Sequence, residues 1–328
     1  MNDNRKNILI ICPVFHGYEK RIFSCIQHSM KYKHLYFIKD APLISEKYFL
    51  ILKNIFPKFG SGLLKRANKR ILKCVRNNNI DTLFIVKGRY VSDSTVSLIQ
   101  KEYPTIRMVL YEWDSISNNP NALKLLGIIR ESYTFDFEDA QKFKGYNYHP
   151  LFYSFDQLPV PPKETKNIDF LFVGGFSLER MPLFIKIKTL CEEEGWNFTF
   201  HLFVPYSVYV KYKSIMHPYK RFISFKSLNY ERYYSLIRKT KAVVDIVNSD
   251  QTGLTIRSIE ALSQYCHLIT TNRRIVEMNF YTESNITIVE SDNIGKDVLK
   301  KALETNFNRA YNKTIYSTKE WLEIMDII

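Results

Sequence analysis

Short runs of aliphatic residues recur along the whole chain, and each run leads through a polar or glycine-containing loop into a segment with helical periodicity. The first run covers residues 8–11, ends at Cys12-Pro13 and precedes a predicted helix at 20–30. Continuous aliphatic runs of this length are typical of strands that are buried on both faces, and their alternation with helices indicates parallel pairing. The sequence therefore predicts an α/β fold built on parallel sheets.

Strands of this kind are predicted in both halves of the chain. They lie at residues 8–11, 35–38, 80–86, 106–111 and 132–135 of the first half, and at 168–173, 198–204, 222–226, 242–247 and 268–272 of the second. Two separate sheets are expected, because residues 158–166 between the halves combine three prolines with charged residues, as stiff linkers do.

This pattern divides the chain into four parts. We predict an N-terminal Rossmann-like domain at 1–158, a linker at 159–166, a second Rossmann-like domain at 167–305 and a terminal helical segment at 306–328. In the last part, Trp321, Leu322 and Met325 recur at helical spacing and need a core to pack on, such as that of the N-terminal domain.

Length and composition agree with two globular domains. The chain has 328 residues, of which 45% are apolar and 24% charged. No apolar run approaches the roughly 20 residues that span a bilayer, and the run at 8–15 lacks a signal-peptide cleavage site. The five cysteines are scattered without metal-ligand spacing, and their odd number is typical of reduced thiols in a cytoplasmic protein without a zinc site.

The formal charge of +14 indicates an anionic partner. No helix-turn-helix, zinc-finger or RNA-recognition pattern is present, so we expect no nucleic acid. Residues 48–73 mix aromatic and aliphatic residues with Lys and Arg, as helices on anionic membranes do, and Pro57 and the triplet Gly60-Ser61-Gly62 are expected to break them into two pieces. The alternative, that the second piece packs its apolar face on the sheet, stays open.

A predicted helix start in the second half has the composition of an anion-binding site. Gly253 permits a turn, Thr255 is expected to cap the helix, and the free N–H groups of its first turn attract phosphate oxygens. Arg257 adds a planar charge suited to a diphosphate, and Glu260 on the same face is suited to sugar hydroxyls. The alternative is a surface helix with an Arg–Glu pair.

A glycine turn follows the first strand of the second half. Gly174, Gly175 and Phe176 leave that strand, and Arg180 stands near the start of the next helix. The glycines allow a ligand to approach the backbone closely, although the spacing is not that of a dinucleotide-binding fingerprint. We predict that Gly174, Gly175, Phe176 and Arg180 contribute to an anion site.

Polar residues also follow the predicted strands of the first half. They are His16 and Gly17 after the first strand, Lys87 after the third, and Trp113 with Asp114 after the fourth. An aromatic face beside a carboxylate suits a sugar ring whose hydroxyl gives up a proton, so Asp114 is a candidate base. The alternatives are solvated loop residues and, for Asp114, a helix cap.

Acidic residues at 136–139 superficially resemble a metal-binding motif. Asp136 and Asp139 have the spacing of a helix cap, which is the stronger explanation. We therefore predict no metal.

Together these features resemble the GT-B class of glycosyltransferases, and within it the bacterial branch of spore-coat CgeB-like proteins and of lipopolysaccharide or capsule sugar transferases. The likeness spans most of the chain, but only its C-terminal motif is specific. It departs from the pattern at Tyr265, where a glycine usually follows the helix. The residues that carry it are 251–254, Arg257, 260–262, 268–272, 280–281 and 285–286, with 113–115, Phe135, Asp136 and Asp139 as N-terminal markers.

The resemblance implies two doubly wound domains that face each other across a cleft. It also implies a metal-independent, cytoplasmic transferase, peripheral on the inner face of the plasma membrane, that moves a sugar from a UDP-type nucleotide donor to a lipid-linked glycan. The donor side would comprise Gly174, Gly175, Phe176, Arg180, Ser227, Leu228, Gln251, Thr252, Gly253, Leu254, Thr255, Arg257 and Glu260. The acceptor side would comprise His16, Gly17, Lys87 and Trp113.

Asp114 would deprotonate the acceptor in an inverting enzyme, whereas a retaining enzyme would not need that base. Two other functions remain open. One is a nucleotide-sugar epimerase, and the other is a non-catalytic protein that binds polysaccharide or membrane surfaces on a transferase fold.

Overall fold

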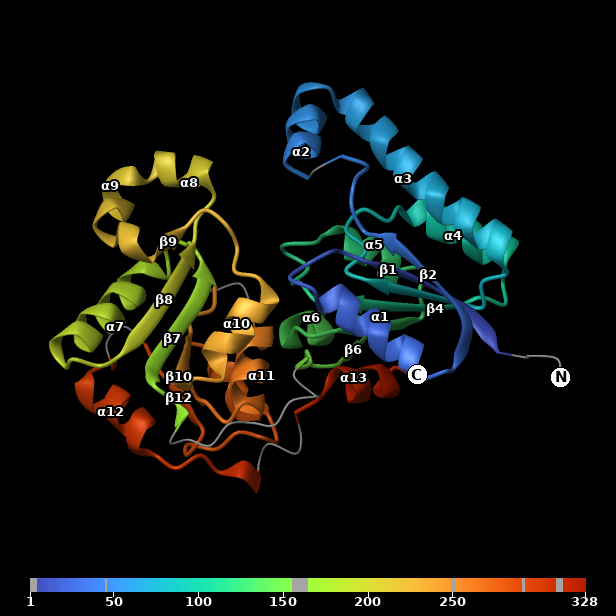
Figure 1. Cartoon of the computed structure of the whole chain (residues 1–328). Helices are drawn as coiled ribbons and strands as arrows, with labels where there is room; N and C mark the ends of the chain where they lie inside the picture. Colours follow the sequence, from blue (N-terminus) through green and yellow to red (C-terminus); the bar gives the residue numbers. More distant parts are fainter. Residues whose placement is uncertain (1–4, 45, 155–164, 249–251, 291–292, 311–314) are drawn as a thin grey trace. The chain divides into compact units, whose positions relative to one another are not determined.

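The computed structural model describes residues 5–44, 46–154, 165–248, 252–290, 293–310 and 315–328. The chain divides into two compact units, of which unit 1 comprises Met1–Pro150 with Thr318–Ile328, and unit 2 comprises Leu151–Ser317. Each unit contains one six-stranded sheet in which every neighbouring pair of strands is parallel (Figure 1). The predicted α/β class with two parallel sheets is confirmed.

Unit 1 has the strand order β2-β1-β3-β4-β5-β6. Its strands are β1 (Lys6–Cys12), β2 (Tyr32–Lys39), β3 (Thr82–Val86), β4 (Arg107–Glu112), β5 (Glu131–Thr134) and β6 (Tyr146–Tyr148). Its helices are α1 (Tyr18–His28), α2 (Glu46–Ile55), α3 (Pro57–Asn78), α4 (Asp93–Glu102), α5 (Asn121–Leu126), α6 (Phe137–Lys142) and α13 (Thr318–Ile324).

Unit 2 has the strand order β12-β11-β10-β7-β8-β9. Its strands are β7 (Ile168–Gly175), β8 (Phe198–Phe203), β9 (Ile223–Ser224), β10 (Thr240–Asp245), β11 (His267–Thr270) and β12 (Ile286–Ile288). Its helices are α7 (Met181–Glu193), α8 (Tyr206–Lys211), α9 (Lys213–Met216), α10 (Tyr230–Ile237), α11 (Ile256–Ser263) and α12 (Lys296–Glu304), with the 3-10 turns η2 (His217–Phe222) and η3 (Arg273–Glu277).

The terminal helix α13 packs into unit 1. Trp321 is fully buried there, with its ring 4.6 Å from that of Tyr111, and its carbonyl oxygen accepts a hydrogen bond from Nε2 of His149 at 3.1 Å. The chain passes from unit 1 to unit 2 after Pro150 and returns to unit 1 after Ser317. The sequence analysis ended the N-terminal domain at 158 and the second domain at 305. Most of the predicted linker lies outside the described residues.

The segment at 48–73 differs from its prediction in one respect. Helix α3 begins at Pro57, a favoured first position for proline, and continues without a break through Gly60-Ser61-Gly62. The predicted break at Gly60-Ser61-Gly62 is therefore wrong. The apolar face of α3 packs on the sheet of unit 1, where Ile71 and Val75 join the core, as the alternative for the second piece proposed.

The order of the strands creates a switch point in each sheet. In unit 2 the chain runs from β7 outward to β9 and then returns to β10 on the other side of β7. In unit 1 it runs from β1 to β2 and returns to β3 on the other side of β1. In open parallel sheets, ligands bind outside the carboxyl ends of the strands near such points.

Candidate functional site

The carboxylate of Asp245, at the carboxyl end of β10, connects three residues at the start of α11. Its Oδ2 accepts hydrogen bonds from Thr255 Oγ1 at 2.5 Å and from Ser258 Oγ at 2.6 Å, and its Oδ1 accepts from Nε and Nη2 of Arg257 at 3.2 and 3.0 Å. Asp245 is fully buried, whereas Arg257 exposes 25% of its side chain. The polar residues of the predicted helix start therefore converge on one buried acid.

Thr255 caps α11, as the sequence predicts. Its Oγ1 accepts a hydrogen bond from the backbone N–H of Ser258 at 3.1 Å while it donates to Asp245. The C-terminal end of α11 is stabilised as well. Tyr265 adopts a left-handed backbone with φ of 52° in the place where glycine usually stands, and the carbonyl oxygens of Gln264 and Tyr265 accept hydrogen bonds from the buried ammonium of Lys166.

Asp245 is a functional candidate that the sequence analysis missed. Burial raises the pKa of this carboxyl, but the charge of Arg257 and the hydrogen bonds from Ser258 and Thr255 bring the pKa below its usual value. Its negative charge therefore offsets part of the positive potential that the helix start and Arg257 were expected to offer a diphosphate. The available signal was an acid that directly follows Val243 and Val244 at the end of a buried strand.

Arg180 is a second cation at this edge of the sheet. It precedes α7, and its Nη1 donates to the carbonyl oxygen of Gly175 at 3.2 Å. Its buried Nε has no hydrogen-bond acceptor, and no carboxylate in the described part of the chain forms an ion pair with it. Burial, and then the charge of Arg257, lower the pKa of Arg180 to about 10. This edge of the sheet therefore carries two guanidinium groups.

The two glycines at the end of β7 have different roles. A Cβ at Gly174 would lie 2.9 Å from Cζ of Phe172, so this glycine makes room for a core side chain. A Cβ at Gly175 would meet no described atom within 4 Å, so this glycine leaves the backbone open beside Arg180. Close approach of a ligand to the backbone is therefore possible at Gly175.

Glu260 lies on α11 but has no exposed surface. Burial, and then the charge of Glu260, raise the pKa of Tyr233 well above its usual value. A ribose would reach the Glu260 carboxylate only after a neighbouring side chain moved. The role of Glu260 in sugar binding stays a prediction.

The remaining donor-side residues are spread over unit 2. Thr252 and Gly253 offer their carbonyl oxygens to Nδ2 of Asn272 at 3.1 and 3.2 Å, which ties this loop to the end of β11. Leu254 is buried in the core, and the ring of Phe176 packs 5.7 Å from that of Tyr212. Ser227 and Leu228 follow the edge strand β9, and Gln251 lies outside the described residues.

In unit 1 the structure brings the acceptor-side candidates to the ends of three adjacent strands, β1, β3 and β4. Lys87 follows β3, and its Nζ forms an ion pair with Oδ2 of Asp114 at 2.8 Å. The other oxygen of Asp114 accepts hydrogen bonds from the backbone N–H of Ser115 and from Nδ2 of Asn118. Lys87 has a φ of 69°, a conformation uncommon for residues other than glycine.

Aromatic rings line the same edge. The ring of Phe15, which is 50% exposed, lies 4.3 Å from that of His16 and 6.2 Å from that of Trp113. Gly17, with φ of 88°, turns the chain from this loop into α1. Phe15 was not among the predicted site residues, and its position directly before His16 was the only sequence signal.

Glu112 lies beneath Asp114 and is fully buried. Its oxygens accept hydrogen bonds from Nδ2 of Asn119 at 2.5 Å and from the backbone N–H of Asp114 at 2.9 Å. Burial raises the pKa of the Glu112 carboxyl well above its usual value. Of the two carboxyl groups that flank Trp113, only Asp114 can therefore meet a substrate.

The acidic residues at 136–139 form a helix cap. Oδ1 of Asp136 accepts a hydrogen bond from the backbone N–H of Asp139, which confirms the capping explanation. Across the ranges that the structure describes, His, Cys, Asp and Glu side chains form no group of three that could hold a metal ion.

The two units, each a parallel six-stranded sheet covered by helices, define the GT-B fold. Among solved structures, the chain is similar to AviGT4, a glycosyltransferase involved in avilamycin A biosynthesis, with a TM-score of 0.59 and 11% identity over 97% of this chain and 95% of that one. It is similar to a sucrose-phosphate synthase from Thermosynechococcus elongatus, with a TM-score of 0.55 and 11% identity over 98% and 95% of the two chains.

A third similar structure is the UDP-GlcNAc 2-epimerase of Methanocaldococcus jannaschii in complex with UDP-GlcNAc and UDP. Its TM-score is 0.54, with 12% identity over 98% of this chain and 99% of that one. At these identities the likeness shows the fold alone. No family model matches the chain, and no curated protein matches it.

Proposed function

We propose that this chain is a glycosyltransferase that takes a sugar from a nucleoside-diphosphate donor of the UDP type and adds it to a growing, lipid-linked surface glycan. The observation that carries the proposal is the pair of guanidinium groups of Arg180 and Arg257 at the carboxyl edge of the unit 2 sheet. Among the described residues, Asp245 forms an ion pair with Arg257 and not with Arg180, so a diphosphate would supply an anionic partner for Arg180. The GT-B fold supports the same function.

The proposal assigns departure of the nucleotide to unit 2. As the bond from the sugar to the diphosphate breaks, negative charge grows on the phosphate oxygens. Arg180, the exposed part of Arg257 and the first turn of α11 would stabilise that charge, so no metal ion is needed for this step. Gly175 would let the phosphates approach the backbone, while Glu260 and the backbone near Ser227 and Leu228 would hold the nucleoside.

Activation of the acceptor is assigned to unit 1. In an inverting reaction, Asp114 would take the proton of an acceptor hydroxyl, whose oxygen forms the new bond to the sugar while the nucleoside diphosphate leaves. Asp114 would then exchange its contact with Lys87 for one with the acceptor. The rings of Phe15, His16 and Trp113 offer an apolar surface for sugar rings. A retaining reaction would not need this base.

The narrower proposal for the acceptor comes from the resemblance to CgeB-like, lipopolysaccharide and capsule transferases. Such an acceptor is presented at the inner face of the plasma membrane, and residues 48–73 are the candidate contact with anionic lipid. Among the helices in the described part of the chain, none combines the length and apolar content that a membrane crossing needs.

An epimerase is the second candidate, because a UDP-GlcNAc 2-epimerase shares the fold. It would bind the same class of donor but needs acid and base groups on both faces of one sugar and no acceptor. Turnover of a donor without any added acceptor, to give an epimer, would favour this function.

Calorimetry with UDP, GDP, CMP and dTDP sugars tests the proposal. We expect one of them to bind, and Arg180→Gln to weaken that binding by about ten- to a hundred-fold, as loss of a charged hydrogen bond implies. The matched control is Arg232→Gln, which removes an exposed arginine of α10. Absence of binding by all four, or equal binding by Arg180→Gln, would reject the transferase.

A further inference from the structure

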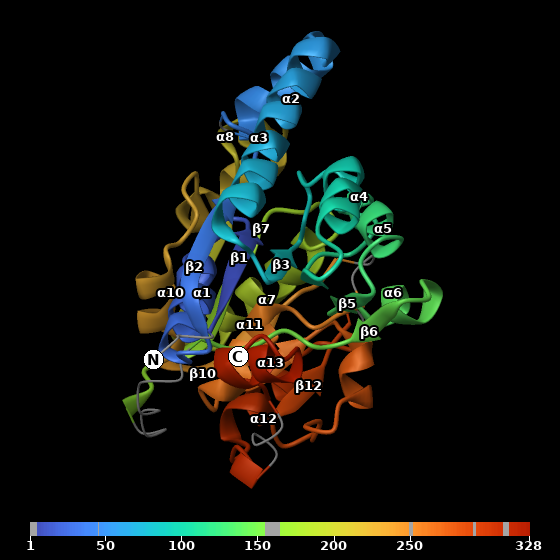
Figure 2. The ribbon, with the colours of Figure 1, turned by 90° about the vertical axis from the view of Figure 1, so that its right-hand side faces the viewer.

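Helix α2 and the start of α3 expose a ridge of large apolar side chains. Tyr48, Ile51 and Ile55 recur at helical spacing on α2 and are 65%, 44% and 62% exposed, and Phe56 and Phe59 continue the ridge into α3 at 59% and 55%. Monomeric proteins rarely leave so many large apolar residues exposed together. Figure 2 shows that α2 and the first turns of α3 project beyond the sheet of unit 1.

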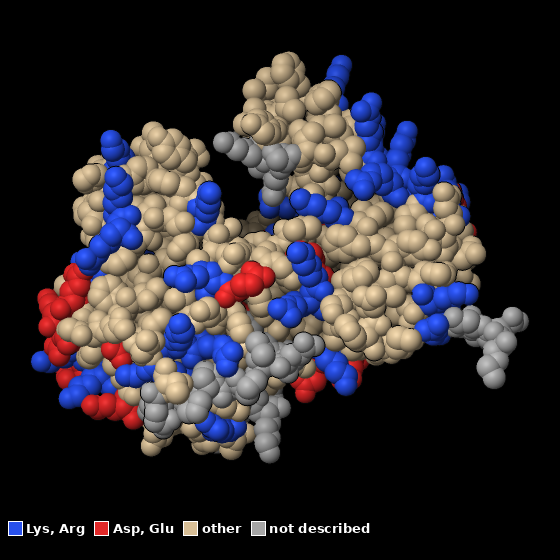
Figure 3. Space-filling view, in the orientation of Figure 1, with Lys and Arg blue, Asp and Glu red and all other residues tan. Residues whose placement is uncertain are grey.

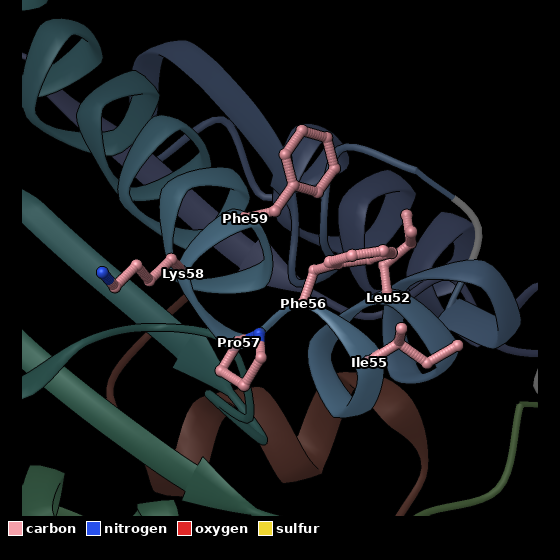
Figure 4. A pocket seen from close by; sticks show the side chains of 6 residues that line it. All are labelled: Leu52, Ile55, Phe56, Pro57, Lys58 and Phe59. Carbon is pink, nitrogen blue, oxygen red and sulfur yellow. The ribbon is translucent and has the colours of Figure 1, made fainter.

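An open pocket of about 710 Å³ lies within this ridge. Figure 4 shows Leu52, Ile55 and the ring of Phe56 close together where α2 meets α3, with the ring of Phe59 beyond them. The described side chains that line the pocket are Leu52, Ile55, Phe56, Pro57, Lys58 and Phe59, and Lys58 is the charged one among them.

A strip of cations continues from the ridge along α3. Lys58, Lys65, Lys69 and Lys73 are spaced by 7, 4 and 4 residues and are all exposed on one face of the helix. Residues 48–78 contain eight Lys or Arg residues and no Asp or Glu. Within the described part of the chain, none of these four lysines forms an ion pair, and Figure 3 shows Lys and Arg side chains gathered over α3.

The opposite face of α3 is already occupied. Leu63, Ile71 and Val75 are buried against unit 1, and Phe49 anchors α2 with its ring 5.7 Å from that of Tyr90. The ridge and the cationic strip therefore lie on surfaces that the core does not use, and the hairpin is held in place from beneath.

We propose that the α2–α3 hairpin docks on an anionic lipid bilayer, with its apolar ridge inserted among the upper acyl chains and its lysine strip on the headgroups. Charge complementarity selects this occupant: residues 48–78 carry aligned cations, no acid and exposed aromatic rings, which fits the boundary between headgroups and acyl chains. A protein partner or a second copy of the chain would have to bring its own row of acids. This docking deepens the lipid contact proposed above for residues 48–73; its evidence is the hairpin itself and not the transferase activity.

Vesicle flotation tests the docking, with vesicles of phosphatidylcholine alone and of phosphatidylcholine mixed with phosphatidylglycerol. We expect the full chain to float with the mixed vesicles and to be released by salt. Lys65→Gln, Lys69→Gln and Lys73→Gln together should lower the partition by about a hundred-fold, since each basic residue at such a surface contributes about five-fold. The control replaces Lys33, Lys101 and Lys124, three exposed lysines of unit 1 outside the hairpin, by Gln and should float as the unchanged chain does.

A second variant separates insertion from charge attraction. Ile55→Ser, Phe56→Ser and Phe59→Ser together should lower the partition at low and high salt, with helix content by circular dichroism and nucleotide binding unchanged. Equal flotation of the lysine variant and its control, or of the serine variant and the unchanged chain, would overturn the proposal. So would a dimer that the serine variant converts to a monomer without any binding to vesicles. Nucleotide binding is measured separately, so failure of the docking and failure of the proposed function give different results.

Discussion

Arg257 donates hydrogen bonds from both Nε and Nη2 to a single oxygen of Asp245, at 3.2 and 3.0 Å. The acid is fully buried at the end of β10, and the arginine stands in the first turn of α11. The pair therefore ties the last residue of a central strand to the helix that follows. Arg257 has a structural role here in addition to any contact with a ligand.

Loss of this arginine should destabilise the protein. We expect Arg257→Ala to lower the free energy of unfolding by about 3–5 kcal/mol, because it leaves a buried carboxylate without its cation. Urea unfolding followed by circular dichroism measures the change, and Arg232→Ala on the exposed face of α10 is the control. A loss below about 1 kcal/mol would mean that Asp245 finds another partner or takes up a proton.

The two glycines of β7 should respond differently to the same substitution. Gly174→Ala should lower the free energy of unfolding by about 1–3 kcal/mol, because its methyl group would press on Phe172. Gly175→Ala should keep stability, because its methyl group meets open space, but should weaken nucleotide binding. Urea unfolding and calorimetry on both variants check this, and full affinity in Gly175→Ala would show that the ligand does not approach the backbone there.

The docking of α13 should weaken in acid through His149. Burial lowers the pKa of His149 to about 4, although its hydrogen bond to the carbonyl oxygen of Trp321 opposes this shift. Because the pKa is lower in the folded protein, the unfolded chain takes up the proton first as the pH falls. The contribution of neutral His149 to the free energy of unfolding is therefore fully present above the unfolded pKa of about 6.5 and is lost as the pH drops towards 4. The loss over this window is about 3 kcal/mol.

The measurement compares the unfolding free energies of the unchanged chain and of His149→Gln, which keeps a donor for Trp321 but does not titrate. Burial raises the pKa of Asp40 to about 6, so Asp40 contributes with the opposite sign in an overlapping window. That contribution is the same in both proteins and cancels in their difference. A difference that does not change between pH 7 and pH 4 would contradict the prediction.

Local patterns were sufficient to predict most of the fold. Strands such as β1 and β3 are continuous aliphatic runs because both faces are buried, and the cap at Thr255 depends on residues only three positions apart. The three-residue strands β6 and β12 were missed, because segments this short carry little periodicity. Helix α3 runs through two glycines because its packing on the core outweighs their low helix propensity.

The pairings within the candidate sites depended on tertiary structure. Asp245 lies 12 residues before Arg257 in sequence, and Lys87 lies 27 residues before Asp114. Only the parallel order of the strands brings each pair to one edge of a sheet. The sequence was sufficient to place each residue at the end of a strand or helix. It did not show which acid would pair with which cation.

Asp114 provides the sharpest test of chemistry at the unit 1 edge. It is 29% exposed and bound to Lys87, whereas the neighbouring Glu112 is fully buried, and burial raises the pKa of its carboxyl. Asp114→Asn should lower turnover at least about a hundred-fold with donor affinity unchanged, because it removes a base but keeps the shape of the side chain. Release of nucleoside diphosphate from the bound donor measures turnover.

Glu112→Gln is the matched control for this variant, because it changes a neighbouring carboxyl that is fully buried and that a substrate does not reach. It should retain most of the turnover. The opposite ranking would assign the base to Glu112, and turnover that survives in both variants would indicate a retaining reaction without either base. In that last case the ion pair of Lys87 and Asp114 would serve to fix the loops after β3 and β4 rather than to move a proton.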